Sequence, residues 1–250
     1  MDAMASVDVV VPVYNEERAL PESIPTLLEF LSSESFPYEW RIVIADNASI
    51  DGTPEVGAKL EDKYPGQLKY VRIERKGRGF ALKQVWLDSP MDVVSYMDVD
   101  LSTGIQDFPA LIGAIADDGY DVAIGSRLAK GARVSRSLKR RILTRGYNTM
   151  IKAMFFTRFS DAQCGFKAVS RKAAQKVIPL IEDNNWFFDT ELLILAEKMG
   201  YRVKDVPVEW IEDTDTRVKI GSTVAEDVRG LIRLRLGQPW RRASEPPATA

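Results

Sequence analysis

The chain has 250 residues, 45% of them hydrophobic and 28% charged, so a single domain with a sizeable core can form. Its 34 Lys and Arg nearly balance its 36 Asp and Glu, which argues against a protein that binds nucleic acid over its whole surface. It has no histidine and one cysteine, Cys164, which excludes Ser-His-Asp and Cys-His triads, Cys/His zinc sites and an internal disulfide. A bound metal must therefore be held by oxygen, and a general base must be a carboxylate, Lys, Tyr or the substrate itself.

Short apolar runs alternate with amphipathic segments along the first half of the chain. The apolar, often β-branched runs predict strands at 7–13, 40–45, 68–73, 92–97 and 120–124. Helical spacing of apolar residues predicts helices at 22–31, 53–64, 80–87 and 108–116. This rhythm is typical of an α/β fold with a mainly parallel sheet and helices on both faces.

The second half is less regular. Its pattern predicts helices at 138–159, 171–181 and 190–199 and strands at 165–170 and 201–208. No linker composition separates the halves, so we expect one domain over 1–237, with a smaller α+β extension packed on the first sheet. The Pro- and Ala-rich segment 238–250 predicts a disordered tail.

Targeting signals are not apparent in the sequence. The first residues lack a basic segment followed by an apolar run, and no window reaches the roughly 18 apolar residues that span a bilayer. We therefore expect a cytoplasmic protein, and the low cysteine content fits a reducing compartment.

Polar residues follow three of the predicted strands, at the edge where open α/β sheets bind ligands. These are Tyr14-Asn15-Glu16, Asp46-Asn47 and Asp98-Val99-Asp100. Asn and Asp also make good turns after strands, which is the simpler explanation for any one of the three loops. Their occurrence in three loops of one edge favours a binding site.

Asp98 and Asp100 are two residues apart, so in an extended segment their carboxylates converge on one side. Two converging carboxylates repel each other unless a cation lies between them, and Mg²⁺ or Mn²⁺ held this way completes its shell with water and substrate phosphates. Surface turns produce the same D-x-D pattern by chance, so the pair alone is a modest indication of a metal site.

The blocks Val9–Glu16, Ile44–Thr53 and Asp98–Asp100, taken in order, resemble the inverting GT-A glycosyltransferases of family 2. The blocks Ile124–Arg127 and Asp161–Lys167 are similar to the branch of polyprenyl- and dolichyl-phosphate hexose synthases. The resemblance covers about residues 7–235 and implies a Rossmann-like GT-A domain. Its nucleotide-sugar half would be about 7–126, and its acceptor half about 127–237.

The resemblance also implies roles for individual residues. Nucleotide-sugar binding would involve Pro12, Tyr14, Asn15, Glu16, Asp46, Lys76, Asp98, Arg217 and Lys219, the last two in a mobile loop closing over the diphosphate. Metal ligands would be Asp98, Asp100 and, more weakly, Ser102. The acceptor phosphate would meet Arg127, Arg140 and Thr144. The catalytic residues would be Asp100, Arg127 and Asp189, with Asp189 at a position often assigned to a base or to acceptor orientation.

This chemistry does not require histidine. Mg²⁺ or Mn²⁺ would neutralise the nucleoside diphosphate leaving group, so no general acid is needed. A lipid monophosphate acceptor is already an anion near neutral pH, so a strong base is dispensable and a cationic cradle suffices.

The sequence offers such a cradle between Arg127 and Ser160, which contains ten Lys and Arg and no Asp or Glu. The alternative is an ordinary solvated basic helix face. Apolar residues between Met150 and Phe159 could dip into a lipid interface, or they could simply pack in the core. A second basic stretch at 229–242 could anchor the protein peripherally at the cytoplasmic face of a membrane or meet a small membrane subunit.

The leading interpretation is thus transfer of a hexose from UDP-glucose or GDP-mannose to a polyprenyl phosphate, and the Gln163–Lys167 block leans toward glucose. One alternative keeps the fold but uses a saccharide or small hydroxyl acceptor, with Asp189 as a true base. A second is a non-catalytic subunit of a membrane glycosylation complex, which the intact Asp98 and Asp100 pair disfavours. Cys164 has no activating histidine, so it is read as a packed residue.

Overall fold

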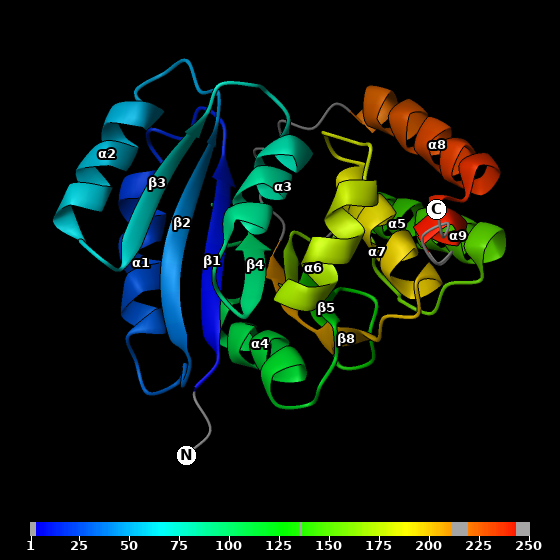
Figure 1. The fold of residues 1–250 in the computed structure, drawn as a ribbon, viewed down its shortest axis with the longest axis horizontal. Coiled ribbons are helices and arrows are strands. Elements are labelled where there is room, and N and C mark those ends of the chain that lie inside the picture. The colour runs from blue at the N-terminus through cyan, green and yellow to red at the C-terminus, as the bar shows by residue number, and fades with distance from the viewer. Residues whose placement is uncertain (1–3, 136, 212–219, 244–250) are drawn as a thin grey trace, which may run out of the picture.

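The computed structural model describes residues 4–135, 137–211 and 220–243 and has a seven-stranded central sheet (Figure 1). The strand order is β3-β2-β1-β4-β7-β5-β8; β7 runs antiparallel to both neighbours and the other pairs are parallel. The strands are β1 Ser6–Val13, β2 Glu39–Asn47, β3 Leu68–Ile73, β4 Val93–Met97, β5 Val122–Ser126, β7 Phe166–Ser170 and β8 Val203–Pro207. Strands β6 (Arg133–Ser135) and β9 (Glu209–Ile211) form a small second sheet. The predicted mainly parallel α/β sheet is confirmed.

Helices cover both faces of the central sheet, because successive residues of a strand point to opposite sides. Val9 and Val11 of β1 pack in a core with α1 (Leu20–Leu31), α2 (Thr53–Lys63) and α4 (Phe108–Ala116). Val10 points the other way, into a core with α3 (Arg78–Asp88), α5 (Leu138–Phe155), α6 (Arg171–Val177), α7 (Phe188–Lys198) and α8 (Ile220–Gly237). Both cores consist mainly of fully buried aliphatic and aromatic side chains.

The second half of the chain does more than pack on the first sheet. Strand β7 inserts between β4 and β5, and β8 extends the same sheet at its edge. The antiparallel register places Tyr96 opposite Lys167 and Met97 opposite Phe166. The expected α+β extension is therefore part of the central sheet, and both halves of the chain share one hydrophobic core.

Two predicted segments end differently in the structure. Helix α5 stops at Phe155 because Phe156 takes a left-handed backbone conformation, with φ 55°. The prediction of a disordered tail from Gln238 is wrong for its first part, since Pro239–Ala243 forms α9 and Trp240 is buried against Phe155. The ring of Trp240 supplies the apolar area that holds this short helix. Residues 244–250 lie outside the described part of the chain.

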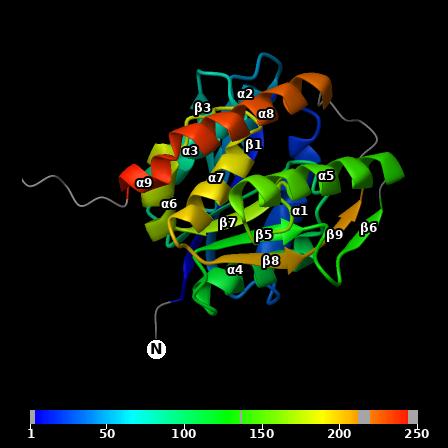
Figure 2. The same cartoon turned by 90° about the vertical axis from the view of Figure 1, so that its right-hand side faces the viewer.

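The apolar residues near the end of α5 mostly serve the core. Ile151, Phe155 and Phe159 are buried within it, which confirms core packing for these residues, whereas Phe156 is 81% exposed. Helices α5, α8 and α9 lie together on the side of the molecule that faces the viewer in Figure 2.

Helix α8 carries a buried acid, Asp227, on its inner side. The side chain is 3% exposed; Oδ2 accepts a hydrogen bond from Gln163 Nε2 at 3.0 Å, and Oδ1 has no partner among the described residues. Burial raises the pKa of Asp227 to about 7; a hydrogen bond from Tyr147 opposes this effect and the Asp183 and Glu226 charges add to it. Helix α8 therefore docks best when Asp227 is protonated.

Because the folded-state pKa of Asp227 lies above its unfolded value, the folded protein binds this proton more tightly than the unfolded chain does. Stability from this group is present at low pH and is lost as pH rises through about 7. We expect Asp227→Asn to lose less stability than wild type between pH 5 and pH 8, by roughly 2–4 kcal/mol. Urea unfolding at both pH values measures this difference. Asp62→Asn, at an exposed position of α2, controls for loss of one charge, and equal pH slopes in Asp227→Asn and wild type would contradict the assignment.

Candidate active site

The loops after β1, β2 and β3 are tied together at the carboxyl edge of the sheet. The backbone N–H of Asn15 donates to Ser49 Oγ at 2.9 Å, and Asn15 Oδ1 accepts from the Ile50 N–H at 2.9 Å. Asn47 Oδ1 accepts from the Gly77 N–H at 2.5 Å. Only glycine fits at position 77, because its φ is 151° and a Cβ there would lie 2.6 Å from the carbonyl oxygen of Asn184. The loops after β1, β2 and β3 therefore meet at one edge of the sheet, and Asp98–Asp100 follows β4, which runs parallel to β1, at the same edge.

Asp46, predicted to contact the base or ribose, is fully buried and already has protein partners. Its Oδ1 accepts from the Ser49 N–H at 2.9 Å, and its Oδ2 accepts from Tyr70 Oη at 2.6 Å and Arg72 Nη1 at 3.1 Å. Its first demonstrable role is to fix the loop after β2. A contact with the nucleotide remains a prediction.

The remaining residues of the predicted nucleotide pocket border the same loops. The ammonium of Lys76 lies 3.8 Å from the centre of the Tyr14 ring. The Glu16 N–H donates to Thr53 Oγ1 at 2.8 Å, and Pro12 is half-buried near the end of β1. Arg217 and Lys219, predicted for a closing loop, lie outside the described residues.

The Asp98 and Asp100 pair follows β4 directly. The side chain of Asp98 is 41% exposed and Asp100 is exposed, while Asp100 Oδ1 accepts from the Ser102 N–H at 2.9 Å. Partial burial raises the pKa of Asp98; Arg78 opposes this and the Asp100 and Asp189 charges add to it. The backbone of Gly165 lies so close that a Cβ there would collide with Asp98 Oδ2. Gly165 therefore determines where the first carboxylate can sit.

The donor set fits a divalent cation of the Mg²⁺ or Mn²⁺ kind. The described residues contain no group of three or more Asp, Glu and Cys that could enclose a metal ion. Two carboxylates at an exposed edge suit an ion that takes its other ligands from water and phosphate. For Ser102 the structure shows a backbone contact with Asp100, and ligation by its hydroxyl remains a prediction.

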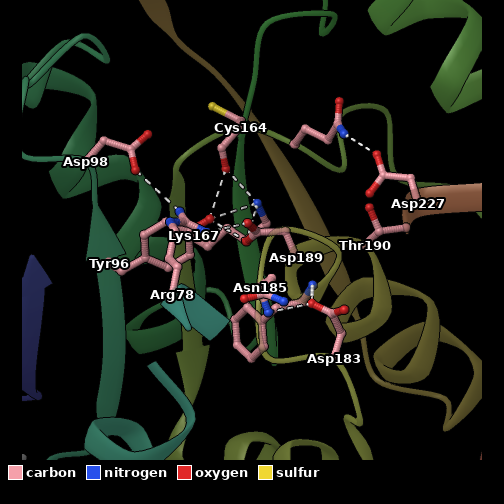
Figure 3. Close-up of polar contacts among 12 residues, drawn as sticks. Arg78, Tyr96, Asp98, Cys164, Lys167, Asp183, Asn185, Asp189, Thr190 and Asp227 are labelled. Atoms are coloured by element: carbon pink, nitrogen blue, oxygen red, sulfur yellow. Dashed lines mark hydrogen bonds and ion pairs between the residues drawn. The ribbon is translucent and has the colours of Figure 1, made fainter. Parts of the chain in front are cut away.

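Beside this pair lies a buried charge network built on Asp189 (Figure 3). Asp189 Oδ2 pairs with Arg78 Nη1 at 2.8 Å, and Oδ1 pairs with Lys167 Nζ at 3.1 Å. The Tyr96 hydroxyl donates a short hydrogen bond to Oδ1. Lys167, which is fully buried, also donates to the Cys164 carbonyl at 2.5 Å. Arg78 Nη2 reaches Asp98 Oδ1 at 3.3 Å, so this guanidinium joins Asp189 to the carboxylate pair.

These contacts decide the charge state of Asp189. Burial alone would raise its pKa, but the Lys167 and Arg78 charges, with hydrogen bonds from Tyr96 and Arg78, leave the pKa below its ordinary value. A carboxylate held this way is a weak proton acceptor. In the structure Asp189 is the counter-ion of two cations, and its role as a base or in orienting the acceptor remains a prediction.

The predicted acceptor-phosphate residues are only partly brought together. Arg127 forms a two-pronged pair with buried Asp161, Nε to Oδ2 at 2.7 Å and Nη2 to Oδ1 at 2.9 Å. Arg140 and Thr144 lie one turn apart on α5, with Arg140 half-buried and Thr144 buried. The engagement of Arg127 by Asp161 means that a phosphate would share a guanidinium already in use, and all three roles remain predictions.

Sequence reasoning missed three members of the network: Arg78, Tyr96 and Lys167. Arg78 stands in the Gly-rich segment Lys76–Gly79, from which only Lys76 was selected. Lys167 is a charged residue in a predicted strand, and that anomaly was the available signal. Cys164 was read correctly as a packed residue: it is fully buried, and burial raises the pKa of its thiol to about 12.

Three known proteins of similar sequence illustrate the relatives of this chain. The glycosyltransferase AglD of Haloferax volcanii is 32% identical over 247 residues, which are 99% of this chain and 39% of that protein. The chain thus spans about two fifths of AglD. A dolichyl-phosphate beta-glucosyltransferase of Trichomonas vaginalis, ALG5A, is 30% identical over 89% of this chain and 71% of its own length. The dolichyl-phosphate beta-glucosyltransferase of Drosophila melanogaster is 33% identical over 82% and 66%.

Solved structures share the fold at low sequence identity. Glucosyl-3-phosphoglycerate synthase of Mycobacterium tuberculosis, in complex with Mn²⁺, UDP-glucose and phosphoglyceric acid, superposes with a TM-score of 0.70 at 16% identity, over 93% of this chain and 80% of that one. The mannosyltransferase PcManGT of Pyrobaculum calidifontis, in complex with GDP-Man and Mn²⁺, gives a TM-score of 0.59 at 18% identity, over 98% and 69%. The model of glycosyl transferase family 2 matches residues 8–178. The chain therefore belongs to glycosyl transferase family 2 and is a glycosyltransferase.

Proposed function

We propose that this enzyme transfers glucose from a nucleotide sugar to a polyprenyl or dolichyl phosphate, with Mg²⁺ or Mn²⁺ at Asp98 and Asp100. The observation that carries the proposal is the state of Asp189, a buried acid neutralised by Lys167 and Arg78. Because the two cations stabilise its ionised form, Asp189 would accept a proton poorly. Such a site suits an acceptor that is already charged and needs no base. The names of the dolichyl-phosphate beta-glucosyltransferase relatives support the acceptor class and favour glucose over mannose.

In this proposal the carboxylates serve the donor, through the metal ion, and the basic residues serve the acceptor. Asp98 and Asp100 would hold the cation, which when bound offsets the charge that develops on the diphosphate leaving group. On the acceptor side, Arg140 and Thr144 share one face of α5, and the basic run around them contains no acid between Arg127 and Ser160. These residues would orient the lipid phosphate in line with the sugar.

The same helices offer a surface for a lipid bilayer. Helix α8 exposes Val224, Val228, Ile232 and Leu236 at four-residue spacing, and α5 exposes Leu138, Ile142 and Leu143. Exposed basic residues on the two helices, among them Arg141, Arg145, Arg229 and Arg235, accompany these apolar stripes. Each such charge near anionic lipid contributes about 1 kcal/mol, so a few suffice for reversible docking. No helix in the described part of the chain is long and apolar enough to cross a membrane.

The proposal is tested by a donor panel. UDP-glucose and GDP-mannose are each incubated with Mn²⁺ or Mg²⁺ and a short polyprenyl phosphate, presented in anionic or neutral vesicles. We expect a lipid-linked glucose that chelation by EDTA prevents, with faster transfer on anionic vesicles because of the basic helices. Absence of any lipid-linked sugar from folded, metal-loaded protein would refute the proposal, and equal rates on both vesicle types would refute the role of the basic surface.

Substitution of Asp189 distinguishes an enzyme that uses a phosphate acceptor from one that uses a hydroxyl acceptor. We expect Asp189→Asn to keep measurable transfer to the polyprenyl phosphate, with kcat reduced about 10- to 100-fold because Arg78 and Lys167 lose a counter-ion. If the true acceptor is a hydroxyl group and Asp189 its base, the same change abolishes turnover. Asp8→Asn is the matched control: Asp8 is a buried acid paired with Arg41 at 2.9 Å near the start of β1, so it reports the general cost of unpairing a buried acid.

Gly165 provides a test of the metal site that leaves both carboxylates in place. In Gly165→Ala the new Cβ collides with Asp98 Oδ2, so the carboxylate must move. We expect Mn²⁺-dependent binding of UDP, followed by calorimetric titration, to weaken at least about tenfold, because misplacing one ligand of a two-carboxylate site costs most of its affinity. Gly146→Ala on α5, where a Cβ meets nothing within 4 Å, is the control. Wild-type affinity in Gly165→Ala would rule out Asp98 as a ligand.

A further inference from the structure

Arg78 occupies an unusual position between two acids of different kinds. Its guanidinium lies 2.8 Å from Asp189 Oδ2 and 3.3 Å from Asp98 Oδ1, and its side chain is 11% exposed. Aromatic rings flank it, with the Tyr96 and Trp186 centres at 4.7 and 5.0 Å. One of its two acidic partners, Asp98, is a ligand of the proposed metal site. A bound divalent cation and Arg78 would therefore compete for the same carboxylate.

Asp189 does not depend on Arg78 for neutralisation. Lys167 Nζ lies 3.1 Å from its Oδ1, and the Tyr96 hydroxyl donates to the same oxygen. Arg78 can thus lose or weaken a contact without leaving Asp189 unpaired. The contact at 3.3 Å with the more exposed Asp98 is the longer of its two pairs and the one open to exchange.

The charge balance of the cluster indicates what kind of group Arg78 would bind in place of Asp98. Asp98, Asp100 and Asp189 carry three negative charges, and Arg78 and Lys167 carry two positive ones, so the cluster has a net charge of one negative. A divalent cation turns this into an excess of one positive charge, which an anionic ligand must offset. Arginine binds phosphate oxygens in two-pronged fashion, and Trp186, which is 45% exposed, leaves this side of the guanidinium near solvent.

We propose that Arg78 is a phosphate-positioning residue that exchanges partners: it pairs with Asp98 before the metal binds, and it binds a substrate phosphate oxygen once the cation occupies Asp98. The inference rests on the proposed function for its metal and for its phosphate ligands. Those ligands are the diphosphate of the nucleotide sugar and the monophosphate of the acceptor, which present the same chemistry to a guanidinium. Throughout the exchange, Asp189 keeps hold of the other edge of Arg78 and so fixes where it points.

Two variants test the exchange. Arg78→Met removes the charge while keeping much of the apolar length, and Arg78→Lys keeps the charge without the planar fork. Arg41→Met is the matched control, since Arg41 pairs with buried Asp8 near the opposite end of the sheet. Mn²⁺ binding is followed by the electron paramagnetic resonance signal of the unbound ion, without nucleotide. Binding of UDP with saturating Mn²⁺, and of farnesyl phosphate without nucleotide, is followed by calorimetric titration.

We expect the two kinds of affinity to move in opposite directions. Arg78→Met should bind Mn²⁺ alone about tenfold more tightly because a competing cation is gone, yet bind a phosphate ligand at least about tenfold more weakly. A loss confined to UDP assigns the donor diphosphate, and one confined to farnesyl phosphate assigns the acceptor. Arg78→Lys should keep wild-type Mn²⁺ affinity and bind phosphate with an affinity between those of wild type and Arg78→Met. This second variant still tests the proposal if Arg78→Met does not fold.

A purely structural role for Arg78 predicts another pattern. Weaker or unchanged Mn²⁺ binding in Arg78→Met, or wild-type binding of both phosphate ligands, would overturn the proposal. These titrations involve no sugar transfer. A failed donor panel would therefore refute the proposed function and leave the Arg78 result standing, and unchanged titrations would refute the role of Arg78 in an enzyme that still makes lipid-linked glucose.

Discussion

The antiparallel pairing of β7 with β4 is the constraint on which the site depends. Because the two strands run in opposite directions, the start of β7 lies beside the end of β4, and the ladder continues from Met97 opposite Phe166 to a 3.3 Å hydrogen bond from the Asp98 N–H to the Gly165 carbonyl. This pairing brings Gly165 against Asp98 and Lys167 against Tyr96. A parallel strand in this place would start at the opposite edge and leave both carboxylates without these neighbours.

One consequence is that the first and second halves of the chain cannot move apart as rigid bodies. Strand β7 comes from the second half and lies inside the sheet of the first, so the charge network between Asp98 and Asp189 is built on a shared core. Arg78 comes from α3, Lys167 from β7 and Asp189 from α7, and each is held by packing as well as by charge. Packing of this kind keeps charged side chains in a fixed orientation toward a substrate and excludes water from them.

Much of the fold could be predicted from residue patterns, because the signals are local. Apolar runs of six or seven residues predicted β1 to β4 to within one or two residues, and polar residues after three strands indicated the edge proposed to bind ligands. Local patterns do not specify which strands pair, so segment 165–170 was predicted as a strand but its insertion between β4 and β5 was not. The partners of Asp189 were missed for the same reason, since Tyr96 and Lys167 are 93 and 22 residues away in sequence. The packing of Trp240 against Phe155 was also missed, because Pro and Ala around it suggested a disordered tail.

Two buried acids in the second half of the chain show how a protein without histidine can set protonation states by environment alone. Asp189 faces two cations, and its pKa falls despite burial. Asp227 is flanked by Gln163 and Tyr147, and burial together with the nearby Asp183 and Glu226 charges raises its pKa to about 7. The acid nearer the carboxylate pair is thus held ionised, while the acid with the raised pKa belongs to α8 and lies away from Asp98 (Figure 3). Because Lys167 and Arg78 stabilise the ionised form of Asp189, this carboxylate is a poor proton acceptor at the proposed site. That arrangement favours an acceptor whose nucleophilic oxygen has already lost its proton in solution.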